Sequence, residues 1–175
     1  RGEPVEHNTE FRLYNSAEAA ADNPFSFGTY YVVRFGQSLK GLLPGAPVEY
    51  RGIPVGRVER VMIKDMVLAG EFDGREKNVG QPIPVLIYVE PARMELPDTE
   101  AAVVAMRRTI ETGVAHGLRA TLESGNLLTG AKYIGIDFFK DSEPAEIGSF
   151  GEYATLPAVE GGFDQVLVQV NALLD

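Results

Sequence analysis

The chain contains no cysteine and no tryptophan among its 175 residues. The lack of cysteine excludes a disulfide framework and a thiolate metal site, and it leaves the redox compartment undefined. Basic residues are also few, because 16 lysines and arginines face 25 aspartates and glutamates, giving a formal net charge of −9. Nucleic-acid affinity comes largely from lysine and arginine neutralising phosphates. This balance therefore argues against nucleic acids and anionic membrane surfaces as partners.

Long hydrophobic runs are missing from the sequence as well. No apolar stretch approaches the roughly 20 residues that cross a bilayer, and no positively charged start followed by an apolar stretch marks a signal peptide. The chain begins at Arg1 without an initiator methionine, so we expect it to be a piece of a longer protein.

Motifs that carry catalysis or bind metal are not found either. The two histidines, His7 and His116, have no neighbouring ligand spacing such as HExxH, and neither GxSxG nor GxGxxG occurs. Gly125 to Gly130 mimics the glycine spacing of a phosphate-binding P-loop, but Ala131 stands where that motif needs lysine. We expect no enzyme activity, no metal site and no cofactor.

Glycines and β-favouring residues dominate the stretch from Gly41 to Val58. Glycines at positions 41, 45, 52 and 56 separate short runs that contain Val48, Tyr50, Ile53, Val55 and Val58. These side chains favour a pleated, half-buried surface, and glycine supplies turn or bulge conformations that other residues resist. The pattern predicts tightly connected strands of a small barrel, continuing through Ile63.

Further strands are predicted from short apolar runs or from alternation of apolar and polar residues. They cover Tyr30–Phe35, Pro82–Glu90, Leu118–Leu122, Ala131–Phe139 and Tyr153–Leu156. Between them, Asp65–Gln81 carries many charges and turn residues, and is predicted to be a surface loop.

The hydrophobic period changes after Thr99, which predicts a helix near residues 99–116. Val103, Met106, Ile110 and Val114 recur at helical spacing, Asp98 or Thr99 is placed to cap the start, and Gly117 is placed to end the helix. We expect this helix to pack on the barrel.

A second helix is predicted to start beyond Gly161-Gly162. Its apolar residues recur in steps of three and four, as in a coiled-coil seam. A helix folded back on its own domain fits equally well. The fold class is therefore mainly β: a small β-barrel with an inserted α-helix and the start of a C-terminal amphipathic (coiled-coil) helix. We expect a lead-in strand and linker over residues 1–27, the barrel over 28–142, a connecting segment over 143–160 and the C-terminal helix over 161–175.

Leu127 and Leu128 are unusual, since two large aliphatic residues stand at the tip of a loop bounded by Gly125 and Gly130. One interpretation is a plug that folds down over the barrel end, and single exposed leucines are common enough to need no cause. The alternative is that another molecule covers them.

Two blocks of sequence resemble the MCE (mammalian cell entry) domain family. They are Gly41–Val58 and LESGNLLTGAKYIGIDFF from Leu122 to Phe139, and the resemblance extends to QPIPVLIYVEPARM and TLPAVEGGFDQVLVQVNALLD. It implies a small MCE-type β-barrel that forms homohexameric rings, in which this loop converges on the axis. Leu127 and Leu128 would then line a central pore, with Gly125, Asn126, Thr129 and Gly130 as the framework of the loop.

The resemblance also implies a function, which is non-catalytic lipid transport across the periplasm between inner and outer membranes. The parent protein would be anchored to the inner membrane of a Gram-negative bacterium. Expected partners are phospholipid or another amphiphile, an integral inner-membrane protein and an outer-membrane lipoprotein. A structural spacer that spans the envelope without conducting lipid remains an alternative. An adhesion module would need a receptor-binding surface that nothing in the sequence identifies.

Overall fold

The computed structural model describes residues 25–71, 80–126 and 128–159. Three predicted features lie outside these ranges: the lead-in strand with most of its linker, the side chain of Leu127, and the C-terminal helix. Within the described ranges, no helix is both long enough and apolar enough to cross a bilayer.

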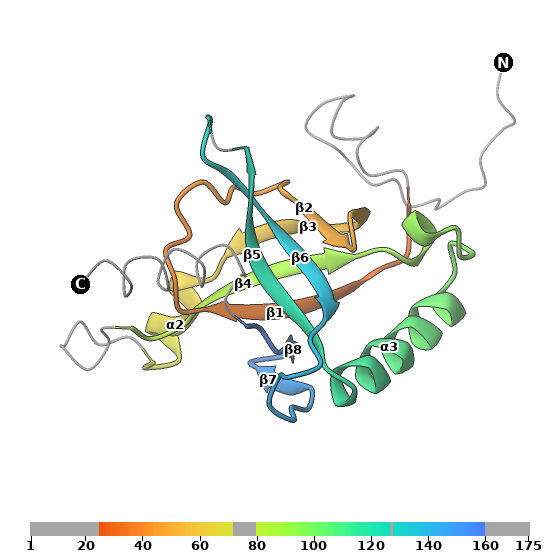
Figure 1. The fold of residues 1–175 in the computed structure, drawn as a ribbon. Helices are drawn as coiled ribbons and strands as arrows, with labels where there is room; N and C mark the ends of the chain where they lie inside the picture. Colours follow the sequence, from red (N-terminus) through yellow and green to blue (C-terminus); the bar gives the residue numbers. More distant parts are fainter. Residues whose placement is uncertain (1–24, 72–79, 127, 160–175) are drawn as a thin grey trace, which may run out of the picture.

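The described part of the chain is mainly β-structure, which confirms the predicted fold class. Its strands are β1 (Thr29–Phe35), β2 (Pro47–Tyr50), β3 (Ile53–Val61), β4 (Ile83–Val89), β5 (Leu118–Asn126), β6 (Ala131–Phe138), β7 (Gly148–Phe150) and β8 (Tyr153–Leu156). Its helical elements are α2 (Ile63–Leu68), the 3-10 helix η2 (Pro91–Met94) and α3 (Glu100–Ala115), shown in Figure 1.

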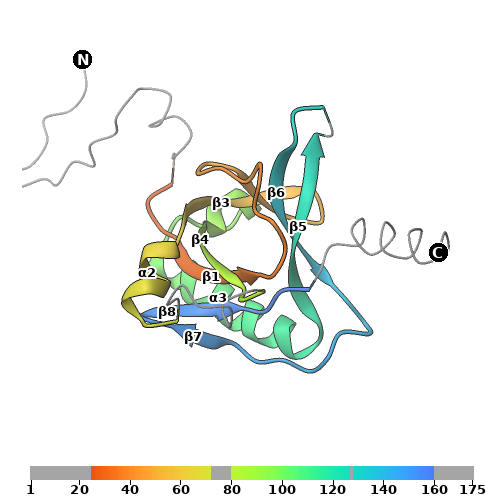
Figure 2. The same cartoon turned by 90° about the vertical axis from the view of Figure 1, so that its left-hand side faces the viewer.

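The strands form one sheet in the order β5-β6-β2-β3-β4-β1-β8-β7. Figure 2 shows that this sheet is strongly curled. The chain after β8 then reaches the opposite edge strand, because the backbone of Ala120 in β5 bonds Pro157 and Val159, each at 2.9 Å. This bridge brings the two sides of the curled sheet together, as a barrel requires.

The core lies inside the curl and is built from residues that alternate along the strands. Fully or nearly fully buried members include Val33, Phe35, Val58, Ile87 and Ile134. Strand β4 is buried along almost its whole length, because its outward residues meet a second apolar cluster that includes Val32, Met62, Met66, Leu86 and Phe150. This two-sided burial confirms the apolar run that predicted a buried strand here.

Helix α3 begins and ends where the sequence predicts. The Thr99 side chain caps the helix by accepting a hydrogen bond from the backbone N–H of Ala102 at 3.3 Å, and Gly117, at φ +97°, follows its C-cap. Asp98 contacts a different segment: its carboxylate accepts hydrogen bonds from the backbone N–H groups of Ser26 and Phe27, both at 2.9 Å. The cap alternative is therefore resolved in favour of Thr99.

A buried arginine holds the C-terminal end of α3. The guanidinium of Arg119 donates to the carbonyls of Val114 and Leu118, both at 2.8 Å, and to the carbonyl of Glu143. A cation at a helix C-terminus is favoured by the helix dipole and by the unpaired carbonyls there. Arg119 thus fixes α3 to the start of β5 and to the chain that follows β6.

The predicted loop at Asp65–Gln81 is wrong at its first residues. Residues up to Leu68 belong to α2, whose Met66 is buried and whose Asp65 pairs with Arg60 at 2.6 and 3.2 Å. The preceding strand accordingly ends at Val61 rather than at Ile63. The strand predicted at Tyr153–Leu156 is confirmed as β8, which pairs in parallel with β1, whereas β7 has no counterpart in the sequence prediction.

In the part of the chain that the structure describes, Glu90 is the one acidic residue with a buried side chain, and it has no exposed surface. Its Oε2 lies 2.5 Å from Nε of Arg93 and 3.1 Å from Nη1 of Arg57. The Arg57 guanidinium also lies over the Tyr88 ring, 4.8 Å from its centroid. The carboxylate thereby joins the end of β4, strand β3 and helix η2.

Replacing this carboxylate should destabilise the barrel. Glu90→Gln removes the negative charge that pairs with both guanidiniums. We expect the free energy of unfolding to fall by about 2 kcal/mol. The loss stays this small because both arginines are partly exposed to solvent. Chemical denaturation measures this loss. Glu146→Gln, an exposed glutamate, is the control. Equal stabilities of the two variants would contradict the assigned role of Glu90.

Candidate functional site

The candidate site is the loop between β5 and β6. The two strands pair in antiparallel register from Leu118 opposite Phe138 to Asn126 opposite Ala131, with a bulge between Ser124 and Asn126. Figures 1 and 2 both show this hairpin projecting well beyond the rest of the sheet. The loop is therefore held away from the barrel wall by a paired, twisted ribbon.

Hydrogen bonds within the loop fix its backbone. The side-chain carbonyl of Asn126 accepts from the backbone N–H groups of Leu128 and Thr129, at 2.9 and 3.1 Å, while its backbone carbonyl accepts from Gly130 at 2.8 Å. The Thr129 hydroxyl accepts from the backbone N–H of Ala131 at 3.4 Å. Asparagine is suited to such turns because its side chain reaches the backbone two and three residues on. Asn126 and Thr129 thus hold the loop through contacts with its own backbone.

The two glycines that bound the loop serve different purposes. Gly130 has φ +70°, a conformation that side chains other than glycine resist. Gly125 is not among the described residues with positive φ, and a Cβ there would lie 3.3 Å from the ring of Tyr133. Gly130 therefore shapes the return of the chain, whereas Gly125 leaves room for an aromatic ring.

The return side of the loop, from Gly130 to Lys132, rests on the segment before β2. The carbonyl of Gly41 accepts from the backbone N–H of Lys132 at 3.0 Å, and Lys132 Nζ donates to the carbonyl of Ser38 at 2.9 Å. Gly41 has φ +92°, and a Cβ there would come within 1.9 Å of the Gly130 carbonyl oxygen. Only glycine permits this close approach, so the first glycine of the Gly41–Val58 block supports the loop.

Leu128 stands at the tip of the loop with 98% of its surface exposed. It does not fold down over the barrel end, so the plug interpretation is wrong for this residue. Complete burial of a leucine side chain is worth roughly 1.5–3 kcal/mol relative to exposure. Because the loop holds this side chain in water, binding of any partner that covers Leu128 gains part of this free energy.

The flanks of the loop carry polar and charged side chains of both signs, among them Glu123 and Lys132. Burial, followed by the charges of Glu123 and Glu49, raises the pKa of Tyr133, which keeps its phenol protonated. In the ranges that the structure covers, no three histidine, aspartate or glutamate side chains are grouped to hold a metal ion. The arrangement can bind an apolar group at its tip, and its described side chains form no acid–base pair for catalysis.

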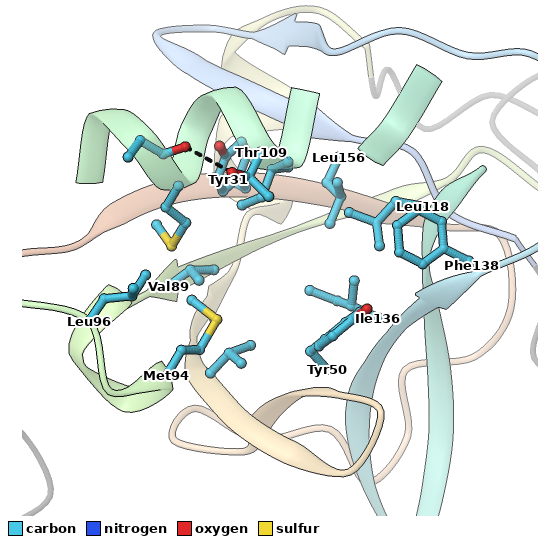
Figure 3. Close-up of a pocket in the computed structure, with 14 residues that line it drawn as sticks. Tyr31, Tyr50, Val89, Met94, Leu96, Thr109, Leu118, Ile136, Phe138 and Leu156 are labelled. Carbon is cyan, nitrogen blue, oxygen red and sulfur yellow. Dashed lines mark hydrogen bonds between the residues drawn. The ribbon is translucent and has the colours of Figure 1, made fainter. Parts of the chain in front are cut away.

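A second feature was missed by the sequence reasoning. An apolar cavity of about 420 Å³ lies between α3, η2 and one end of the barrel, and is drawn in Figure 3. Its walls include Met106 and Ile110 of α3, Ile136 of β6 and Met94 of η2. The periodicity of the sequence identifies such residues as core, but it carries no signal for whether neighbouring side chains fill the space between them.

Comparison with known proteins places this chain in a family. A solved structure described as the Acinetobacter MlaFEDB complex in the ATP-bound Vtrans1 conformation is 12% identical over 83% of this chain and 82% of that chain, with a TM-score of 0.44. The family model described as MlaD protein matches residues 27–139, well over half of the sequence. This match confirms the MCE resemblance, and the chain belongs to the MlaD (MCE) protein family.

Proposed function

We propose that this chain is a non-catalytic lipid-transport module. In the proposal it forms a homohexameric ring whose apolar central pore conducts phospholipid or a similar amphiphile. Membership of the MlaD (MCE) family supports a role associated with lipid transport. The observation that carries the pore is the fully exposed Leu128 at the tip of a projecting hairpin whose backbone is fixed by Asn126.

Lipid traffic through water needs such a lining. Moving apolar carbon into water costs about 0.8 kcal/mol per CH₂, or on the order of 12 kcal/mol for a ~16-carbon chain. An apolar tunnel removes most of this cost without binding any one lipid tightly. Cyclic symmetry builds the tunnel from six copies of one short loop.

The loop has the parts that this role requires. Leu127 and Leu128 are the proposed lining, and Gly125, Asn126, Thr129 and Gly130 are the proposed framework. In a ring with the hairpins pointing inward, the leucines of neighbouring copies would cover one another. That contact would bury Leu128 and so gain the hydrophobic free energy that is not available in a single copy.

Cellular setting and partners follow from a narrower resemblance. The blocks QPIPVLIYVEPARM and TLPAVEGGFDQVLVQVNALLD resemble the last MCE domain of paraquat-inducible protein B. On this basis we place the chain in the periplasm, in a parent protein anchored to the inner membrane of a Gram-negative bacterium. Its proposed partners are an integral inner-membrane protein and an outer-membrane lipoprotein of the same system.

Charging the loop tip should stop transport and leave the fold intact. The double variant Leu127→Asp, Leu128→Asp places carboxylates in the proposed lining, so we expect lipid transfer between donor and acceptor membranes to fall at least about tenfold, since each charge opposes passage of an apolar chain. Leu68→Asp is the matched control, because Leu68 is also exposed, at 76%, but lies on α2.

Normal transfer by the double variant would contradict the lining role. The rival function, a spacer whose leucines only seal the axis, is tested by a photocrosslinker at position 128. Lipid captured there in cells supports conduction, and a crosslinker that meets only neighbouring copies supports the spacer.

Removing the Asn126 side chain should loosen the loop alone. Asn126→Ala deletes the acceptor shared by the Leu128 and Thr129 amides, so we expect these amides to exchange hydrogen roughly fivefold to tenfold faster. Ser124→Ala, an exposed serine on the same strand, is the control. Hydrogen exchange read by mass spectrometry checks this, and unchanged rates in the asparagine variant would show that the loop is fixed by other contacts.

A further inference from the structure

The cavity beneath α3 has the properties of a hydrocarbon site. Among its lining residues, the only side-chain hydroxyls belong to Tyr31, Tyr50 and Thr109. The Thr109 hydroxyl donates to the Ala105 carbonyl at 3.1 Å, the bond drawn in Figure 3, so it is satisfied within its own helix. A lining this apolar favours hydrocarbon over ordered water, which needs several polar partners.

The cavity opens to the outside between apolar side chains. Leu96, just after η2, is 43% exposed, and Phe138, at the end of β6, is 46% exposed. Figure 3 shows these two residues at opposite ends of the set that lines the cavity. If each carbon takes about the ~30 Å³ of a liquid water molecule, the volume of about 420 Å³ holds on the order of a dozen methylenes. That is room for one alkyl chain and not for two.

A cation lies beside this opening. A shallow groove of about 410 Å³ adjoins the cavity at Thr109 and Phe138 and is also lined by Arg108 and His116. Within the described ranges Arg108 lies in no ion pair, in a chain whose formal net charge is −9. A guanidinium at the mouth of an apolar cavity complements an anionic head group attached to a hydrocarbon tail.

We infer that each copy of this chain binds one single-chain anionic amphiphile, with its alkyl tail in the α3 cavity and its head group beside Arg108. The site goes beyond the proposed pore, because it lies within one copy. In Figures 1 and 2, α3 and the tip of the β5–β6 hairpin lie at opposite ends of the molecule. Binding here therefore needs neither the ring nor the leucine tip.

The test uses the 175-residue chain and saturated fatty acids from about 8 to about 16 carbons, titrated by calorimetry. We expect affinity to rise about fourfold for each added methylene until the cavity is full, and then to level off. Ala105→Phe places a ring in the cavity wall and should weaken binding at least about tenfold. Val104→Phe introduces the same ring outside the cavity lining and should bind like the parent chain.

The contact with the head group is tested separately. Arg108→Gln should weaken binding of a fatty acid severalfold and leave binding of the alcohol of equal length unchanged, whereas Lys64→Gln, on α2, should affect neither. Thr109→Phe replaces Ala105→Phe if the latter does not fold, as judged by its thermal unfolding. An affinity that is independent of chain length, or equal binding by the cavity variants and the Val104→Phe control, overturns the inference.

The occupant of the cavity is read directly from isoleucine methyl resonances. On addition of fatty acid we expect Ile110 and Ile136, which line the cavity, to shift, and Ile53 and Ile63 to stay in place. If the cavity methyls shift on self-association without fatty acid, a second copy fills the site and the inference is wrong. The Leu127→Asp, Leu128→Asp variant should bind fatty acid like the parent chain, so failure here and failure of the pore are separate results.

Discussion

The antiparallel pairing of β5 with β6 is the constraint on which the rest of the structure depends. At one end it carries the loop that exposes Leu128, and at the other it places Leu118 and Phe138 opposite each other in the wall of the α3 cavity. Between these ends, Ala120 accepts and donates the backbone bonds that join β5 to the chain after β8. One ribbon thus fixes the projection of the loop, the closure of the barrel and the shape of the cavity.

Local features of the fold could be predicted because their physical causes lie within a few residues. Thr99 and Gly117 bound α3 through contacts with their own neighbours, and the apolar run at Pro82–Glu90 becomes a strand buried on both faces. The six residues of α2 were missed because so short a helix shows little periodicity amid charged residues. The parallel pairing of β8 with β1 joins residues more than a hundred positions apart, and no local pattern records it.

The candidate site also combines features with local causes and features that depend on distant parts of the chain. Asn126 and Thr129 act on adjacent backbone groups, a local use of these side chains that is typical of their residue types in turns. The place of Gly125 depends on the Tyr133 ring across the strand pair, which the sequence does not reveal. The sequence also does not distinguish a filled core from the cavity beneath α3, because the inward-facing residues have the same apolar pattern in both cases.

Together these features describe a hydrogen-bonded hairpin of an MlaD-family domain that holds an aliphatic side chain in water at its tip. Such a design is consistent with its neighbours in an assembly covering that side chain around a common axis. A reconstruction of the assembled protein by electron microscopy tests this most directly. The account predicts six copies with their Leu128 side chains facing one another across an open channel. Tips that point outward, away from any channel, would contradict it.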